Sequence, residues 1–88
     1  MPTVNTTITG TWTKLANDTD DPVLITSNSL AAIEIATVAT DVAPSVSGHR
    51  LEGFAGGMGV TRSVLGDGFV FARIVDSRFA SAVMVVTK

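Results

Sequence analysis

Hydrophobic and polar residues alternate along most of the chain with the two-residue period of a β-strand. In residues 6–15, Ile8, Gly10 and Trp12 share one face and threonines occupy the other, which predicts a strand with one wet side. Val and Thr occur twelve times each, and their β-branched side chains favour strands. Further alternating runs predict strands at residues 23–27, 30–38, 49–54, 60–65, 69–75 and 80–87.

Residues 30–38 are the one segment in which a helix competes with a strand. Asn28 or Ser29 could cap a helix, and three alanines in the segment favour one. Against this, Ile33 and Ile35 alternate with more polar neighbours at period two, and both are β-branched. We therefore predict a strand here.

Turn-forming residues separate the predicted strands. Residues 17–22 form an acidic turn that ends in Pro22, residues 41–48 form a loop, and residues 76–79 form the last turn. Residues 53–59 are too rich in glycine for the interior of an element. Gly66-Asp67-Gly68 lies between two alternating runs and predicts a hairpin. The pattern indicates one all-β domain over residues 1–88, a small sandwich or barrel of about seven short, mainly antiparallel strands.

Composition adds an excess of apolar side chains to this fold. The 88 residues are 45% hydrophobic and only 16% charged, compared with about 25% charged in an average globular domain. There is no cysteine to form disulfides that would reinforce a small core. The excess lies in the last two predicted strands, each of which is apolar on both faces. A neighbouring element or a second copy must cover the second face, and we expect a second copy.

The expected interface comprises the second-face residues of those two strands: Phe69, Phe71, Arg73, Val75, Val83 and Val85. Arg73 is the only charged member, so it needs an acidic partner, either in its own chain or in another subunit.

Charge and hydropathy exclude several partners. The net charge is −2 and the six basic residues are scattered, which argues against nucleic-acid binding. No apolar run approaches the length of a membrane span, and the first residues lack the features of a signal peptide. We therefore expect a protein made in the cytoplasm, with neither a membrane nor a nucleic-acid partner.

No pattern of catalytic residues is found in the sequence. His49 is the single histidine, and as the first residue of a strand it is expected to face solvent or to donate a hydrogen bond. No nucleophile motif, phosphate-binding loop or cofactor motif is present. We therefore predict a protein that is not an enzyme and has no catalytic, cofactor or metal site.

Two features leave a binding role open. Asp18, Asp20 and Asp21 could attract a hard cation such as calcium, but their spacing does not fit an EF-hand, and an acidic turn is the favoured interpretation. Trp12 could anchor a carbohydrate or a protein partner, but core packing is the favoured interpretation.

The order of features resembles that of small all-β virion proteins of tailed bacteriophages. The similar segments are Thr11-Trp12-Thr13, Pro22-Val23-Leu24-Ile25, Gly48-His49-Arg50-Leu51 and Phe69-Val70-Phe71-Ala72-Arg73, and the resemblance covers about residues 10 to 87. Members of this group serve as capsid decoration or cement proteins, head fibres or tail-associated subunits, often as trimers.

The resemblance implies a homotrimer on the capsid surface that binds the major capsid protein. A tail- or baseplate-associated subunit is the first alternative. The second is a carbohydrate- or receptor-binding module that uses Trp12 and the acidic turn.

Overall fold

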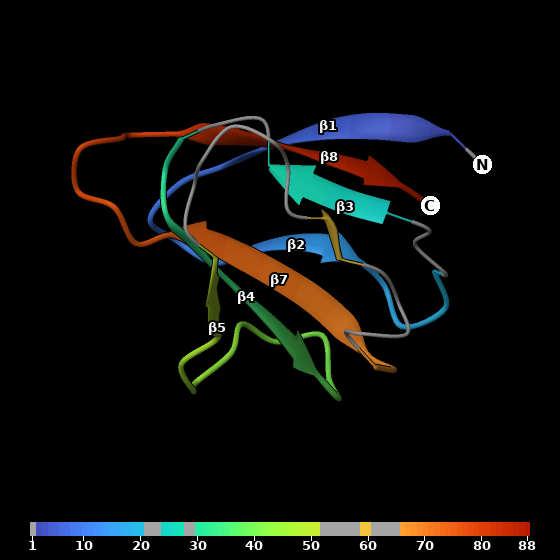
Figure 1. Ribbon diagram of the computed structural model, residues 1–88. Helices are drawn as coiled ribbons and strands as arrows, with labels where there is room; N and C mark the ends of the chain where they lie inside the picture. The colour runs from blue at the N-terminus through green and yellow to red at the C-terminus, as the bar shows by residue number, and fades with distance from the viewer. Residues whose placement is uncertain (1, 21–23, 28–29, 52–58, 61–65) are drawn as a thin grey trace.

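The computed structural model describes residues 2–20, 24–27, 30–51, 59–60 and 66–88 (Figure 1). Within them it contains eight strands in two four-stranded sheets, and every strand pairing is antiparallel. The β8 sheet has the order β1-β8-β3-β6 and the β7 sheet has the order β2-β7-β4-β5. The strands are β1 (Thr3–Ile8), β2 (Thr13–Ala16), β3 (Leu24–Ser27), β4 (Ile33–Val38), β5 (His49–Leu51), β6 (Gly59–Val60), β7 (Phe69–Ile74) and β8 (Ala82–Thr87).

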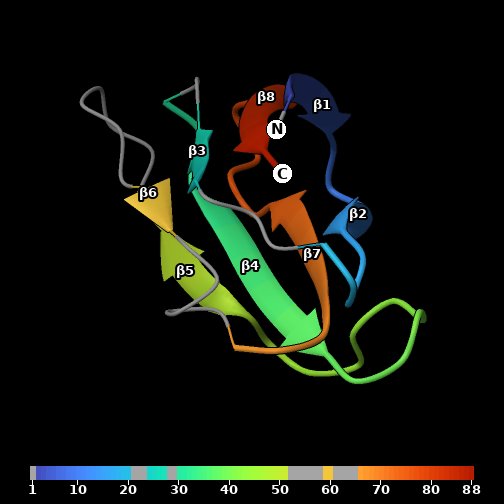
Figure 2. The same cartoon turned by 90° about the vertical axis from the view of Figure 1, so that its right-hand side faces the viewer.

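The two sheets pack face to face around one core (Figure 2). Alternate residues of the inner strands point inward, as the buried Val70, Ala72 and Ile74 of β7 and the buried Ala82, Met84 and Val86 of β8 show. The accessible surface is 4875 Å², close to the roughly 4,900 Å² expected of a compact 9.1 kDa monomer. The prediction of a small all-β sandwich is confirmed.

The first predicted strand, residues 6–15, is wrong, because the structure divides it between the two sheets. β1 ends at Ile8 in the β8 sheet, and β2 begins at Thr13 in the β7 sheet. The chain turns between them: the amide of Thr11 donates to Thr9 Oγ1 at 3.2 Å, and the Thr9 carbonyl accepts from the amide of Ile74 at 2.7 Å. The alternation continues through this corner, so the sequence pattern does not reveal it.

The strand interpretation of residues 30–38 is confirmed, since β4 occupies Ile33–Val38. β3 lies within the predicted strand 23–27, and β5 begins at His49 as predicted. The rest of the predicted strand 49–54, the glycine-rich residues 53–58 and residues 61–65 lie outside the described residues.

The hairpin predicted at Gly66-Asp67-Gly68 is wrong, because other strands occupy both edges of β7. β7 has β2 on one edge and β4 on the other, while β6 pairs with β3 in the opposite sheet. β8 likewise has β1 and β3 as its neighbours, so residues 76–79 connect two different sheets. β7 and β8 are each an inner strand of their own sheet, which explains why both are rich in apolar residues.

Asp76 stabilises the connection between β7 and β8. Its carboxylate accepts hydrogen bonds from the Arg78 amide at 3.1 Å, from Arg78 Nε at 3.0 Å and from Arg78 Nη2 at 2.7 Å. The amide of Phe79 closes the turn by donating to the Asp76 carbonyl at 3.2 Å. The side-chain and backbone hydrogen bonds from Arg78 hold the pKa of the Asp76 carboxyl well below its usual range, so Asp76 carries its charge throughout the neutral and mildly acidic range.

Candidate interaction surfaces

The outer face of the β7 sheet carries three of the expected interface residues. Phe69, Phe71 and Arg73 alternate with the buried residues of β7 and therefore point away from the core. In register with them on β4 lie Val38, Ala36 and Glu34.

Part of this outer face is covered by the chain itself. Phe71 is only 6% exposed in a single copy, and Ala36 beside it is also buried. The connection 39–48 between β4 and β5 lies on this side of the sheet (Figure 1), and Pro44 within it is buried. Phe71 is therefore covered by its own chain, and no second copy is needed to bury it.

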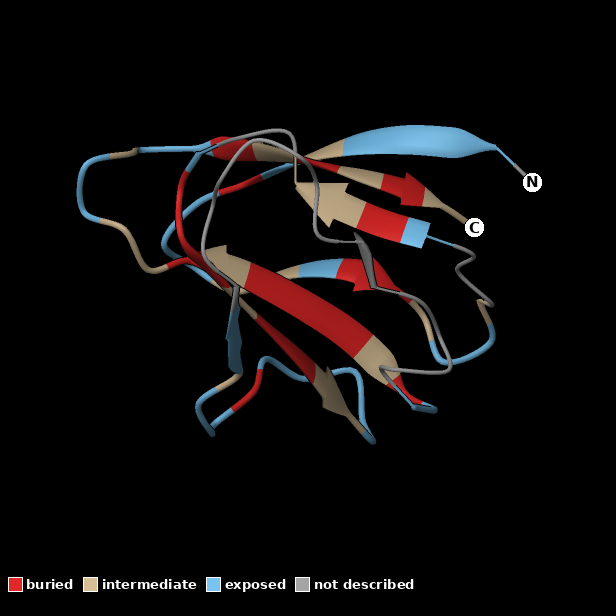
Figure 3. Ribbon diagram, viewed as in Figure 1, coloured by how far each residue is buried: buried red, intermediate tan, exposed pale blue. Residues whose placement is uncertain are grey.

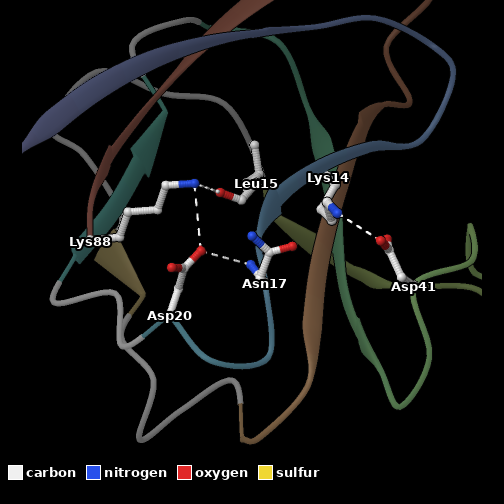
Figure 4. Close-up of polar contacts among 6 residues, drawn as sticks. All are labelled: Lys14, Leu15, Asn17, Asp20, Asp41 and Lys88. Carbon is white, nitrogen blue, oxygen red and sulfur yellow. Dashed lines mark hydrogen bonds and ion pairs between the residues drawn. The ribbon is translucent and has the colours of Figure 1, made fainter.

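Two contacts hold this connection against the β7 sheet. Lys14 Nζ on β2 lies 2.8 Å from Asp41 Oδ2 (Figure 4). At the other end of the connection, a Cβ added to Gly48 would lie 2.7 Å from the Ile35 carbonyl oxygen and 3.1 Å from Trp12 Cη2. Only glycine allows so close an approach to the backbone of β4.

Arg73 has its acidic partner in its own chain. Arg73 Nε donates to Glu34 Oε1 at 2.8 Å, and Arg73 Nη2 lies 2.7 Å from the same oxygen. The guanidinium also stacks on the Trp12 ring, 4.5 Å from the ring centre. The acidic partner that Arg73 needs is thus Glu34 of the same chain, which the sequence pattern did not connect with Arg73.

Trp12 lies outside the hydrophobic core, so the prediction that it packs there is wrong. Its side chain is half-buried against Arg73 and next to Gly48 on the outer face of the β7 sheet. The reason is the corner between β1 and β2, which brings Trp12 out of the alternation that Ile8 begins. Trp12, Gly48 and Arg73, from three separate parts of the sequence, meet at this place.

We expect Arg73→Met to lower the free energy of unfolding by about 1–2 kcal/mol, because it leaves the mostly buried Glu34 carboxylate without its donor. The side chain of Glu34 is 12% exposed and that of Arg73 is 34% exposed, so solvent weakens the pair only partly. Lys14→Met, which removes the exposed pair with Asp41, is the control and should cost less than about 0.5 kcal/mol. Urea denaturation measures both, and equal losses would contradict a special role for Arg73.

The outer face of the β8 sheet has a different character: it carries no charged side chain among the described residues. By strand alternation and register, its members are Thr3, Asn5, Thr7, Leu24, Thr26, Val83, Val85 and Thr87. Val83 and Val85 run along its middle on β8, and threonines flank them on both neighbouring strands. At one end, Thr3 Oγ1 and Thr87 Oγ1 share a hydrogen bond of 2.8 Å. We call these eight residues the uncharged face.

The six expected interface residues therefore do not form one patch. Phe69, Phe71 and Arg73 lie on the outer face of the β7 sheet, whereas Val83 and Val85 belong to the uncharged face on the opposite side of the sandwich. Val75 follows β7, and its amide donates to the Ala32 carbonyl at 3.0 Å.

The acidic turn ties the C-terminal residue to β2 (Figure 4). Asp20 Oδ2 accepts a hydrogen bond from the Asn17 amide at 2.9 Å and lies 3.6 Å from Lys88 Nζ. Lys88 Nζ also donates to the Leu15 carbonyl at 3.2 Å. Asp20 thus has a structural role in the turn, whereas Asp18 is exposed and Asp21 lies outside the described residues.

Candidate chemistry is sparse in the part of the chain that the structure describes. No group of three or more His, Asp or Glu side chains there could hold a metal ion. His49 is the first residue of β5 and is exposed, as predicted. Nor do the described residues include a helix that is long and apolar enough to span a membrane.

Comparison with known proteins gives no relative: no family model, no curated protein and no solved structure matches the chain.

Proposed function

We propose that this protein is a structural subunit of a tailed-bacteriophage virion, a decoration or cement protein that binds the major capsid protein on the capsid surface. The observation that carries the proposal is the uncharged face. Charged residues are depleted at the centres of protein interfaces, and this face lacks them while other surfaces of the same small domain carry Lys14, Asp41, Asp76 and Arg78.

Some of the residues that carry the resemblance to phage virion proteins have a structural role in this domain, and this supports the proposal. Trp12, Gly48 and Arg73 come from three of the similar segments, and they meet on the outer face of the β7 sheet. That cluster stabilises the domain and leaves the opposite, uncharged face for a partner. In this proposal the uncharged face contacts the capsid, and copies of the subunit also contact one another.

Mass spectrometry of purified phage particles tests the location. We expect the chain in complete particles and in tailless heads. Its presence in isolated tails alone would place it on the tail or baseplate, which contradicts the capsid proposal, and its absence from all particles would end the virion proposal.

A binding experiment tests the surface. Heads that lack the protein are mixed with recombinant chain and sedimented. Val85→Lys places a charge in the middle of the uncharged face and should reduce co-sedimentation at least tenfold. Val46→Lys is the matched control, because Val46 is exposed in the connection between β4 and β5; this variant should bind as the wild type does. Equal binding by the two variants would contradict the use of the uncharged face.

A further inference from the structure

β1 is an open edge strand without the usual protection against pairing. Among the described residues it is the terminal strand of the β8 sheet, and β8 is its one pairing partner there. Natural proteins protect such edges with lysine, proline or a bulge. β2, at the edge of the other sheet, carries Lys14 and a register shift between Lys14 and Ala16. Between Thr3 and Ile8 there is no charged residue, no proline and no register shift.

The direction of the backbone groups in β1 follows from one hydrogen bond. The Lys88 amide donates to the Pro2 carbonyl at 3.2 Å, so the backbone of Pro2 faces β8. Alternate residues of an antiparallel strand point their N–H and C=O groups to opposite sides. Thr3, Asn5 and Thr7 therefore direct their backbone groups away from β8, and Thr9, on the same side, accepts from Ile74. The backbone groups of Thr3, Asn5 and Thr7 make no hydrogen bond to the described part of the chain.

This edge is accessible to another chain. Figure 3 shows that most of β1 is exposed, and Thr3, Asn5 and Thr7 are all in this class. In Figure 2, β8 flanks β1 on one side, and the connection toward β2 leaves at its end. Val4, whose side chain lies on the inner side of the sheet, is 38% exposed at this edge.

We propose that two copies of this chain pair β1 with β1, antiparallel, about a two-fold axis that passes beside Asn5. In this register Thr3 lies opposite Thr7 of the partner subunit, and Asn5 lies opposite Asn5 of the partner subunit. Each copy supplies three N–H donors and three carbonyl acceptors, which makes six backbone hydrogen bonds across the axis. A shift of the register by two residues would lose two of them.

The occupant is a second copy because the edge is complementary to itself. Its outward-facing residues are Thr, Asn and Thr, an order that is the same in both directions along the strand. A charged strand would repel an identical strand, and β1 carries no charge. A two-fold contact requires one patch to fit itself, as this one does. The partner strand would also cover the exposed side chain of Val4.

The pairing joins two β8 sheets into one continuous sheet of eight strands. The side chains of Thr3, Asn5 and Thr7 belong to the uncharged face, so the faces of the two copies become one larger surface. This inference concerns the chain alone and does not rest on the virion role. It gives a dimer in place of the trimer that the resemblance implies.

Light scattering after size-exclusion chromatography tests the dimer with the full chain. We expect a mass of about 18 kDa, twice the 9.1 kDa of one chain, that falls toward one chain on dilution. Asn5→Lys places two like charges opposite each other at the axis and should raise the Kd at least tenfold. Thr11→Lys adds the same charge at an exposed position outside β1 and should leave the Kd unchanged. Circular dichroism and melting of both variants under monomeric conditions verify that they fold.

Hydrogen exchange tests the register. As the protein concentration rises, the amides of Thr3, Asn5 and Thr7 should become more protected, while those of Thr6 and Ile8, which already face β8, should not change. A monomer at about 1 mM, a trimer near 27 kDa, or a dimer that is unaffected by Asn5→Lys would each overturn the inference. None of these outcomes bears on whether the chain is found in virions, so the two proposals fail separately.

Discussion

Replacing Ile25 with Ala should lower the free energy of unfolding by about 3 kcal/mol, whereas replacing its neighbour Leu24 with Ala should lower it by less than about 1 kcal/mol. Both changes remove three carbon atoms from adjacent positions of β3. Ile25 points into the core and is 1% exposed, while Leu24 belongs to the uncharged face and is 44% exposed. The truncation of Ile25 leaves a cavity in a packed interior, whereas water fills the space that the truncation of Leu24 leaves.

A domain of this size has a total stability of about 4–13 kcal/mol, so the loss in Ile25→Ala is a large fraction of it. Its melting temperature should fall by roughly 12–24 °C. Urea denaturation of both variants at one protein concentration measures the difference, with unchanged dependence on urea as the sign that only stability has changed. Equal losses would contradict the difference in burial between the two residues, and a larger loss in Leu24→Ala would show that β3 turns its other face to the core.

The alternation of residues predicted the strands and the inward faces of the central strands well. β4 is a strand despite its alanines, because Ile33 and Ile35 bury one face at period two. In β7 the buried Val70, Ala72 and Ile74 are the residues that share one predicted face. Period two is a local property of the chain, and a local pattern is sufficient to determine which side of a strand is buried.

The order of the strands and the elements that cover the outer faces of the sheets are not local properties of the chain. For these two features the sequence prediction failed. The corner at Gly10 moves the chain from one sheet to the other without interrupting the threonine pattern. The pairing of Arg73 with Glu34 depends on the register of two strands that lie far apart in the chain. The apolar residues on both faces of β7 indicated that its outer face must also be covered, but they did not identify what covers it. For Phe71, the same chain provides the cover.

Gly68→Ala should lower the free energy of unfolding by about 3–5 kcal/mol, the largest loss that we expect from a single added methyl group. The φ angle of Gly68 is +139°, which side chains rarely adopt, and this strain accounts for about 1–3 kcal/mol. A Cβ there would lie 2.6 Å from the Val38 carbonyl oxygen and 3.0 Å from Thr37 Cγ2. Since Val38 pairs with Phe69, the clash would displace the beginning of β7 from β4.

Gly66→Ala is the matched control, because it separates backbone strain from the steric clash. Gly66 also has a positive φ, +78°, but an added Cβ would meet no atom within 4 Å among the described residues. We expect this variant to lose about 1–2 kcal/mol, the cost of the left-handed backbone alone. Gly-Asp-Gly resembles a hairpin signal, yet the structure needs Gly68 because β7 runs directly beside β4 at that point. If the two variants lost equal stability, that close approach would be wrong and only the turn conformation would remain as the reason for glycine.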